Sequence, residues 1–151
     1  MPSPVLSGTL ASIFSAATLA VCGKAEIDDA CAPLNCPSQW IWGRHAKYTS
    51  GFSLRHTVVG YAIHHAASIF WAVLYERLAS RQSHHAKLKA AAATSAVAAL
   101  VDFRLTPQRF TPGFEKRLSV ISLAMVYSAF ALGLAAAAVV SRPAVRTGPR
   151  A

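Results

Sequence analysis

The chain has 151 residues, of which 54% are hydrophobic and only 14% are charged. A soluble domain carries about 25% charged residues, so this composition argues against a chain that keeps most of its surface in water. The charge balance is basic, with 15 Lys and Arg against 6 Asp and Glu. These basic residues fall between apolar runs and form no basic helix face, so we expect contacts with lipid headgroups and no nucleic-acid binding.

Four apolar runs approach the length of about 20 residues that a helix needs to cross a bilayer. They lie at about 5–23, 57–76, 87–103 and 118–141, and the last is the clearest. Helices suit these runs because backbone polar groups in lipid must pair internally, and the alternation typical of a barrel is absent. The sequence therefore predicts an all-α fold, a four-transmembrane-helix bundle that forms a single domain of residues 1–151.

Two of the runs leave alternatives open. The third is short and Ala-rich, and its small residues Ala92, Ser95 and Ala99 recur at helical spacing, which lets helices approach closely. We expect it to insert beside the other helices, and a three-helix fold is the alternative. The first run has no basic residue before it, and Val21 is bulky for a lipobox ending at Cys22. We expect a retained helix rather than a cleaved signal peptide.

The distribution of Lys and Arg does not settle the orientation. With the N-terminus inside, the two sides hold nearly equal numbers, seven inside and eight outside. Two weaker arguments favour this orientation. Five acidic residues then lie outside, and so does a cysteine pair, which suits the oxidising compartment of a bacterial envelope. We expect a multi-pass protein of the bacterial inner (plasma) membrane with both termini in the cytoplasm and a disordered tail at 142–151.

The long loop at 24–56 carries the cysteine pair, Cys31 and Cys36. Pro33 and Pro37 keep this segment from forming a regular helix. A single Cys pair with one histidine nearby is a poor match to known zinc spacings, so we expect no metal site. A disulfide between Cys31 and Cys36 and a pair of free thiols both remain open.

The segment before the fourth run reads DFRLTPQRFTPGFEKR and contains two Thr-Pro steps. Each step disfavours helix at the residue before proline. Phe103, Phe110 and Phe114 alternate with arginines, which is typical of a compact loop lying on lipid headgroups. The alternative is a cap over a cavity between the helices.

Ionisable groups inside a membrane span are costly and mark candidate functional sites. In the second run, Tyr61, His65 and Glu76 share one helical stripe that is polar enough to face the bundle interior, and His64 lies on the adjacent stripe. The candidate intramembrane polar site comprises His64, His65, Tyr61, Glu76, Asp102 and His56. We expect Asp102 to pair with His56 or Arg104, and the histidines to form hydrogen bonds across helices with Ser, Tyr or backbone groups.

No cofactor is expected. Adjacent histidines point about 100° apart on a helix and cannot ligate one haem iron from both sides. Motifs of hydrolases, zinc proteases and nucleotide-binding loops are missing from the sequence, so we expect no enzymatic activity.

Three segments, NCPSQWIWG, LRHTVVGYAIHHAASIFWAVLYERL and DFRLTPQRFTPGFE, resemble small, uncharacterised multi-pass inner-membrane proteins of proteobacteria. The resemblance covers about 34–138 and implies a membrane location without a known activity. The chain is also distantly similar to YagU-like inner-membrane proteins, through its Cys-containing first loop and a Leu-Thr-Pro step before the last helix. Leu105, Thr106, Pro107 and Phe110 carry that similarity.

Two functions remain open at the level of sequence. The first is a structural or accessory membrane protein that contacts the lipid bilayer and associates with itself or with another membrane protein through its small-residue faces. The alternative is small-molecule or proton-linked transport or sensing centred on His64 and His65.

Overall fold

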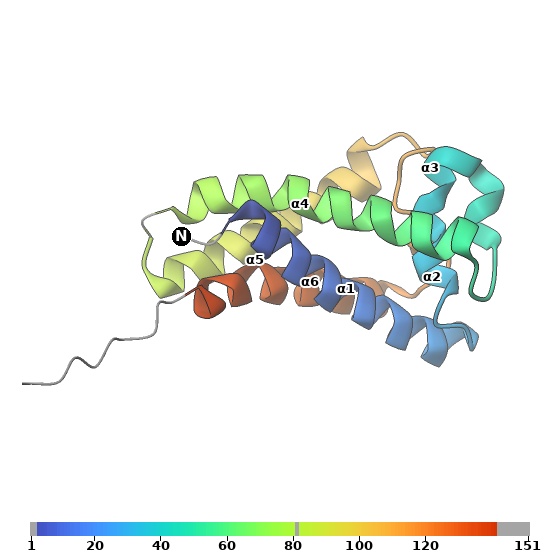
Figure 1. Cartoon of the computed structure of the whole chain (residues 1–151), viewed down its shortest axis with the longest axis horizontal. Helices are drawn as coiled ribbons and strands as arrows, with labels where there is room; N and C mark the ends of the chain where they lie inside the picture. Colours follow the sequence, from blue (N-terminus) through green and yellow to red (C-terminus); the bar gives the residue numbers. More distant parts are fainter. Residues whose placement is uncertain (1–2, 81, 142–151) are drawn as a thin grey trace, which may run out of the picture.

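The computed structural model describes residues 3–80 and 82–141, and within them every regular element is a helix, which confirms the all-α prediction. Four long helices run alternately in opposite directions, so the first and last described residues lie at the same end of the bundle (Figure 1). These helices are α1 (Pro4–Ile27), α4 (Val59–Ala79), α5 (His84–Leu100) and α6 (Val120–Val140). The tail at 142–151, which we expect to be disordered, lies outside the described residues, as does Arg81.

Serine residues begin three of the long helices. The side chains of Ser3, Ser83 and Ser119 each accept a hydrogen bond from the backbone N–H three residues later, at 3.2, 3.3 and 3.2 Å. Such caps satisfy N–H groups that the first helical turn leaves without partners. The local sequence therefore determines where these three helices begin.

Three helices are long and apolar enough to cross a membrane among the residues that the structure describes. They are Pro4–Ile27, Leu54–Ala79 (α4 with a preceding π-helical turn, Leu54–Val58) and Val120–Val140. Helix α5 is not among them: it has 17 residues, carries two lysines in its first turns and continues only through a π-helical turn, Val101–Leu105. The all-helical bundle is thus confirmed, whereas the four predicted spans are matched by three helices of spanning length and composition.

The predicted long loop at 24–56 begins later than expected, and much of it is helical. Helix α1 continues to Ile27, and most of the following segment forms short helical turns at one end of the bundle (Figure 1). These turns are α2 (Ala32–Asn35), η1 (Cys36–Ser38), α3 (Gln39–Trp42) and η2 (Arg44–Tyr48). Pro33 and Pro37 each lie in the first turn of a short helix, where the missing N–H of proline costs nothing.

Hydrogen bonds from two side chains fix the path of this segment. Asn35 donates to the carbonyls of Thr49 (3.0 Å) and Gly51 (2.9 Å) and accepts from the hydroxyl of Thr57 at 2.6 Å. Asp29 accepts three backbone N–H bonds, including one of 2.6 Å from Gly51. Asp29 therefore ties the start of the segment to its end, and Asn35 ties the segment to the turn before α4.

Small residues pack the inside of the bundle. In α1 the buried positions are glycine, alanine, serine and cysteine, with Leu19 the one larger side chain. A Cβ atom added at Gly133 of α6 would lie 2.5 Å from the Cα atom of Ala11, and one at Gly8 would lie 2.6 Å from the Cα of Ile69. Helices α1, α4 and α6 are therefore in backbone contact, as is typical of helices that associate in membranes.

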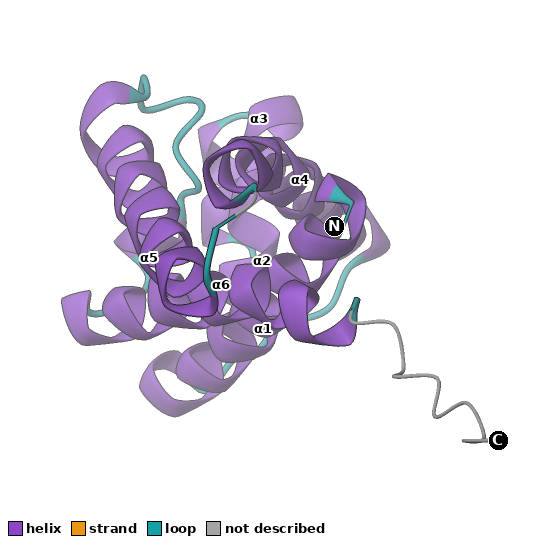
Figure 2. Ribbon diagram, turned by 90° about the vertical axis from the view of Figure 1, so that its left-hand side faces the viewer, coloured by secondary structure: helices purple, strands orange, loops and turns teal. Residues whose placement is uncertain are grey.

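Large apolar side chains lie on the outside of the same helices. Val120, Ile121 and Leu132 of α6 are 82%, 75% and 61% exposed, and Phe70 of α4 is 66% exposed. An apolar outer surface of this extent is unfavourable in water and favourable in lipid. Figure 2 shows the long helices nearly end-on, each with one side facing outward. The outward position of these side chains therefore supports a membrane environment.

Candidate functional site

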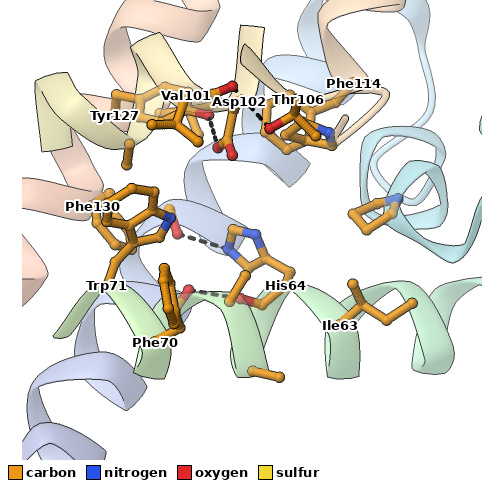
Figure 3. A pocket seen from close by; sticks show the side chains of 18 of the residues that line it. Ile63, His64, Phe70, Trp71, Val101, Asp102, Thr106, Phe114, Tyr127 and Phe130 are labelled. Atoms are coloured by element: carbon orange, nitrogen blue, oxygen red, sulfur yellow. Dashed lines mark hydrogen bonds between the residues drawn. The ribbon is translucent and has the colours of Figure 1, made fainter. Parts of the chain in front are cut away.

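A cavity of about 490 Å³ lies between α4, α5 and α6, and Ser15 of α1 also lines it. Its walls are mainly aliphatic and aromatic, with Phe70 and Trp71 on α4, Val101 beyond α5 and Phe130 on α6 (Figure 3). Cavities of about 300–1,000 Å³ with apolar walls and few polar groups are typical of small-molecule sites. This cavity is the candidate site.

His64 is the polar group on the α4 wall. Its Nε2 atom lies 2.9 Å from the Ser15 hydroxyl oxygen, and the hydroxyl of Ser68 donates to the His64 carbonyl at 2.7 Å. The Ser15 hydroxyl also donates to the carbonyl of Ala11 at 2.7 Å. The expected cross-helix hydrogen bond of the histidine pair is thus present for His64, and its partner is a serine.

Asp102 is the polar group on the opposite wall. It lies in the π-helical turn after α5 and accepts a hydrogen bond of 2.6 Å from the hydroxyl of Tyr127 on α6. Figure 3 shows His64 and Asp102 pointing toward each other across the cavity, with no hydrogen bond between them. The expectation that Asp102 pairs with His56 or Arg104 is wrong, because the helical turn directs its carboxylate toward α6 instead.

The loop between α5 and α6 closes one end of the cavity. Phe110, Pro112 and Phe114 line it, together with Pro37 and Trp40 from the first long segment. The rings of Trp40 and Phe110 pack edge to face at 5.8 Å, and Gln39 donates to the carbonyl of Thr111 at 2.6 Å. Of the two alternatives for this loop, the structure supports the cap over a cavity.

The other residues of the predicted site lie elsewhere. His65 packs against Tyr61, with ring centroids 5.9 Å apart, and its buried Nδ1 atom has no hydrogen-bond partner in the described part of the chain. Glu76 is buried and accepts a hydrogen bond from Ser7 of α1. His56 lies 3.2 Å from the Ser38 hydroxyl. None of these four lines the cavity, so of the six predicted residues only His64 and Asp102 belong to its wall.

Cys31 and Cys36 are free thiols in the structure rather than a disulfide. The thiol of Cys36 is buried and contacts the carbonyls of Ala32 and Lys47, both at 3.3 Å. Burial raises the pKa of this thiol to about 12, so it stays protonated at neutral pH. Cys31 is half-buried at the start of α2. Of the two alternatives for the pair, the structure has free thiols.

Ser15 and Tyr127 belong to the candidate site but were not predicted from the sequence. Each is a hydroxyl-bearing residue inside an apolar run, and each hydrogen-bonds an ionisable group from another helix. Such residues are common in membrane helices, so their presence alone does not indicate a functional site. Within residues 3–80 and 82–141, no three His, Cys, Asp or Glu side chains are grouped so as to hold a metal ion.

No family model, no curated protein and no solved structure matches this chain. The resemblance to proteobacterial inner-membrane proteins and to YagU-like proteins therefore stays a prediction.

Proposed function

We propose that this chain is an integral membrane protein that binds a small lipid-soluble molecule in the cavity between α4, α5 and α6. The observation that carries this proposal is the cavity of about 490 Å³, with apolar walls and two facing polar groups, His64 and Asp102. Ala66 and Phe70 line it and are also exposed on the outer surface of α4, so the cavity opens to the surroundings of the bundle. A ligand dissolved in the bilayer has direct access there.

We also propose that α5 is a fourth membrane-crossing helix. Ser95 of α5 donates to the Tyr127 carbonyl of α6 at 2.6 Å, and Thr94 and Ala98 are buried in the bundle. A weakly apolar helix is stabilised in lipid by such packing. An inner-membrane location with both termini in the cytoplasm fits this topology. Reporter fusions at Gln82 and Arg109 test it: they report opposite sides of the membrane if α5 crosses, and the same side if α5 lies on the surface.

Filling the cavity tests the binding function. Ala67 lines the cavity, whereas Ala62 is exposed on the same helix. We expect native mass spectrometry of the protein purified from its membranes to show one bound lipid-soluble molecule per chain. Ala67→Phe removes this adduct, whereas Ala62→Phe retains it. An adduct that survives Ala67→Phe, or its absence from the unaltered protein, contradicts the proposal.

An accessory role through self-association is the second candidate. Ala92 and Ala96 are exposed on α5, whereas Ser95 and Ala98 are already used inside the bundle. Only the outer part of the small-residue face therefore remains for a partner helix. Ala92→Leu is expected to weaken crosslinking of the protein to itself in detergent if this role holds, and an unchanged crosslinking pattern argues against it.

A further inference from the structure

The hydrogen-bonding character of the His64 side chain follows from its neighbours. The Ser15 hydroxyl donates its proton to the Ala11 carbonyl at 2.7 Å, so toward Nε2 of His64, 2.9 Å away, it acts as the acceptor. In the neutral ring the proton then resides on Nε2, and Nδ1 is left as an acceptor. Figure 3 shows this second nitrogen facing the cavity, on the side of Asp102.

The opposite wall also presents an acceptor. The Tyr127 hydroxyl donates to Oδ2 of Asp102 at 2.6 Å. The other carboxylate oxygen has no hydrogen-bond partner within residues 3–80 and 82–141, and Asp102 lines the cavity. A carboxylate accepts hydrogen bonds only. The two facing polar groups therefore both require a donor.

Aromatic side chains flank the space between these acceptors. Phe130 and Trp71 lie on one side of the His64–Asp102 pair, and Phe114 lies on the other (Figure 3). Aromatic rings bind one another in edge-to-face or offset-stacked arrangements, so such walls favour a ring over a flexible chain. A ligand with a ring and one donor at each end has the chemistry that these walls and the two acceptors call for.

We propose that the cavity binds a quinol-type lipid, with a dihydroxylated aromatic head between His64 and Asp102 and an apolar tail that leaves beside Ala66 and Phe70. This inference rests on the proposed function, because it names the class of molecule that the same cavity takes. One hydroxyl of the head donates to Nδ1 of His64, and the other donates to the carboxylate of Asp102. The oxidised quinone carries acceptors at both positions, so it meets two acceptors and binds more weakly.

The test measures the preference between the two forms. The full chain in nanodiscs is equilibrated without oxygen with equal concentrations of decylubiquinol and decylubiquinone, and the retained ligands are quantified by chromatography against empty nanodiscs. We expect the protein to retain the quinol over the quinone by at least about tenfold, because unpaired buried acceptors are costly. Equal retention of the two forms, or a preference for the quinone, overturns the inference.

Matched variants assign the preference to the cavity. His64→Gln and Asp102→Asn replace an acceptor by an amide that also donates, so each is expected to reduce the preference to below about threefold. His65→Gln makes the same change one residue away, outside the cavity, and keeps the preference. Unchanged preference in both cavity variants, with thermal unfolding showing that they are folded, overturns the inference.

A third probe separates this inference from the function on which it rests. Retention of oleic acid by the protein, above empty nanodiscs and sensitive to Ala67→Phe, supports a lipid-soluble ligand in the cavity. Oleic acid retained without any preference for the quinol leaves the proposed function standing and overturns the quinol assignment. Retention of none of the three probes contradicts both.

Discussion

The Nε2 atom of His64 lies 2.9 Å from the hydroxyl oxygen of Ser15, and this contact joins the second turn of α4 to the middle of α1. It also orients the imidazole ring so that its other nitrogen faces the cavity (Figure 3). One hydrogen bond thus contributes both to the packing of two helices and to the geometry of the candidate site.

We expect Ser15 and His64 to be energetically coupled. Hydrogen bonds between membrane helices contribute about 0.6 kcal/mol on average and about 1.7 kcal/mol at most. A double-mutant cycle of Ser15→Ala and His64→Leu, measured by unfolding in bicelles, should give a coupling free energy in this range. Thr18→Ala is the control, since the Thr18 hydroxyl bonds within its own helix to the Phe14 carbonyl at 2.9 Å. Zero coupling between Ser15 and His64 would contradict the contact.

Gly133 is expected to tolerate no larger residue. The Cβ atom of Gly133→Ala would meet the Leu10 carbonyl oxygen at 2.6 Å as well as the Ala11 Cα, so helices α1 and α6 must separate. Overpacking of this kind costs about 1–3 kcal/mol. The free energy of unfolding measures this effect, and Ala124→Val on the exposed side of α6 is the control. An unfolding free energy unchanged by Gly133→Ala would show that the two helices are farther apart.

The segment between α1 and α4 should lose stability in acid through Asp29. Burial acts to raise the pKa of Asp29, but backbone N–H groups, that of Gly51 foremost, outweigh it and hold the pKa below its usual value. A lowered folded-state pKa contributes stability that is present above the unfolded-state value of about 3.9 and is lost as the pH falls through the folded-state pKa. The unfolding temperature of the unaltered protein should therefore fall more steeply below about pH 4 than that of Asp29→Asn.

Asp28 provides the control for this pH dependence. Its side chain is 88% exposed and pairs with Lys24. Asp28→Asn should follow the pH dependence of the unaltered protein. If Asp29→Asn shows the same acid dependence as the unaltered protein, Asp29 does not hold this segment.

The three cysteines should differ in reactivity toward a maleimide. Cys36 is buried and its pKa is raised to about 12, so the reactive thiolate is scarce at neutral pH, and Cys22 is buried in the bundle. Cys31 is half-buried, so the folded protein should take up one label, located on Cys31 by peptide mapping. Cys31→Ser should take up none. A protein that accepts label only after reduction would carry the disulfide instead.

The all-α fold could be predicted from the sequence because the features that determine helices are local. Apolar runs and serine caps lie next to the residues that they affect, and the predicted runs at 5–23 and 118–141 lie close to the observed α1 and α6. The role of the run at 87–103 was harder to predict, because α5 is weakly apolar and its position in the bundle depends on contacts with α6. Composition alone does not report such contacts.

The site depended on pairings between distant segments. Asp102 and Tyr127 are 25 residues apart, and His64 and Ser15 are 49 apart. The rotation of α4 about its axis decides which of the two adjacent histidines faces the cavity. This rotation depends on contacts with other helices, such as the close packing of Gly8 on Ile69. The sequence correctly predicted that this helix carries the candidate site. It predicted that the stripe with His65 faces the bundle interior, whereas the cavity lies on the side of His64.

Photolabelling with a small apolar diazirine, followed by peptide mapping, tests the ligand-binding cavity most directly. We expect saturable labelling of the cavity walls at 63–71 and 98–106, which Ala67→Phe reduces and Ala62→Phe leaves unchanged. Labelling that is not saturable, and that falls instead on the outward-facing residues Val120, Ile121 and Leu132 of α6, would contradict it.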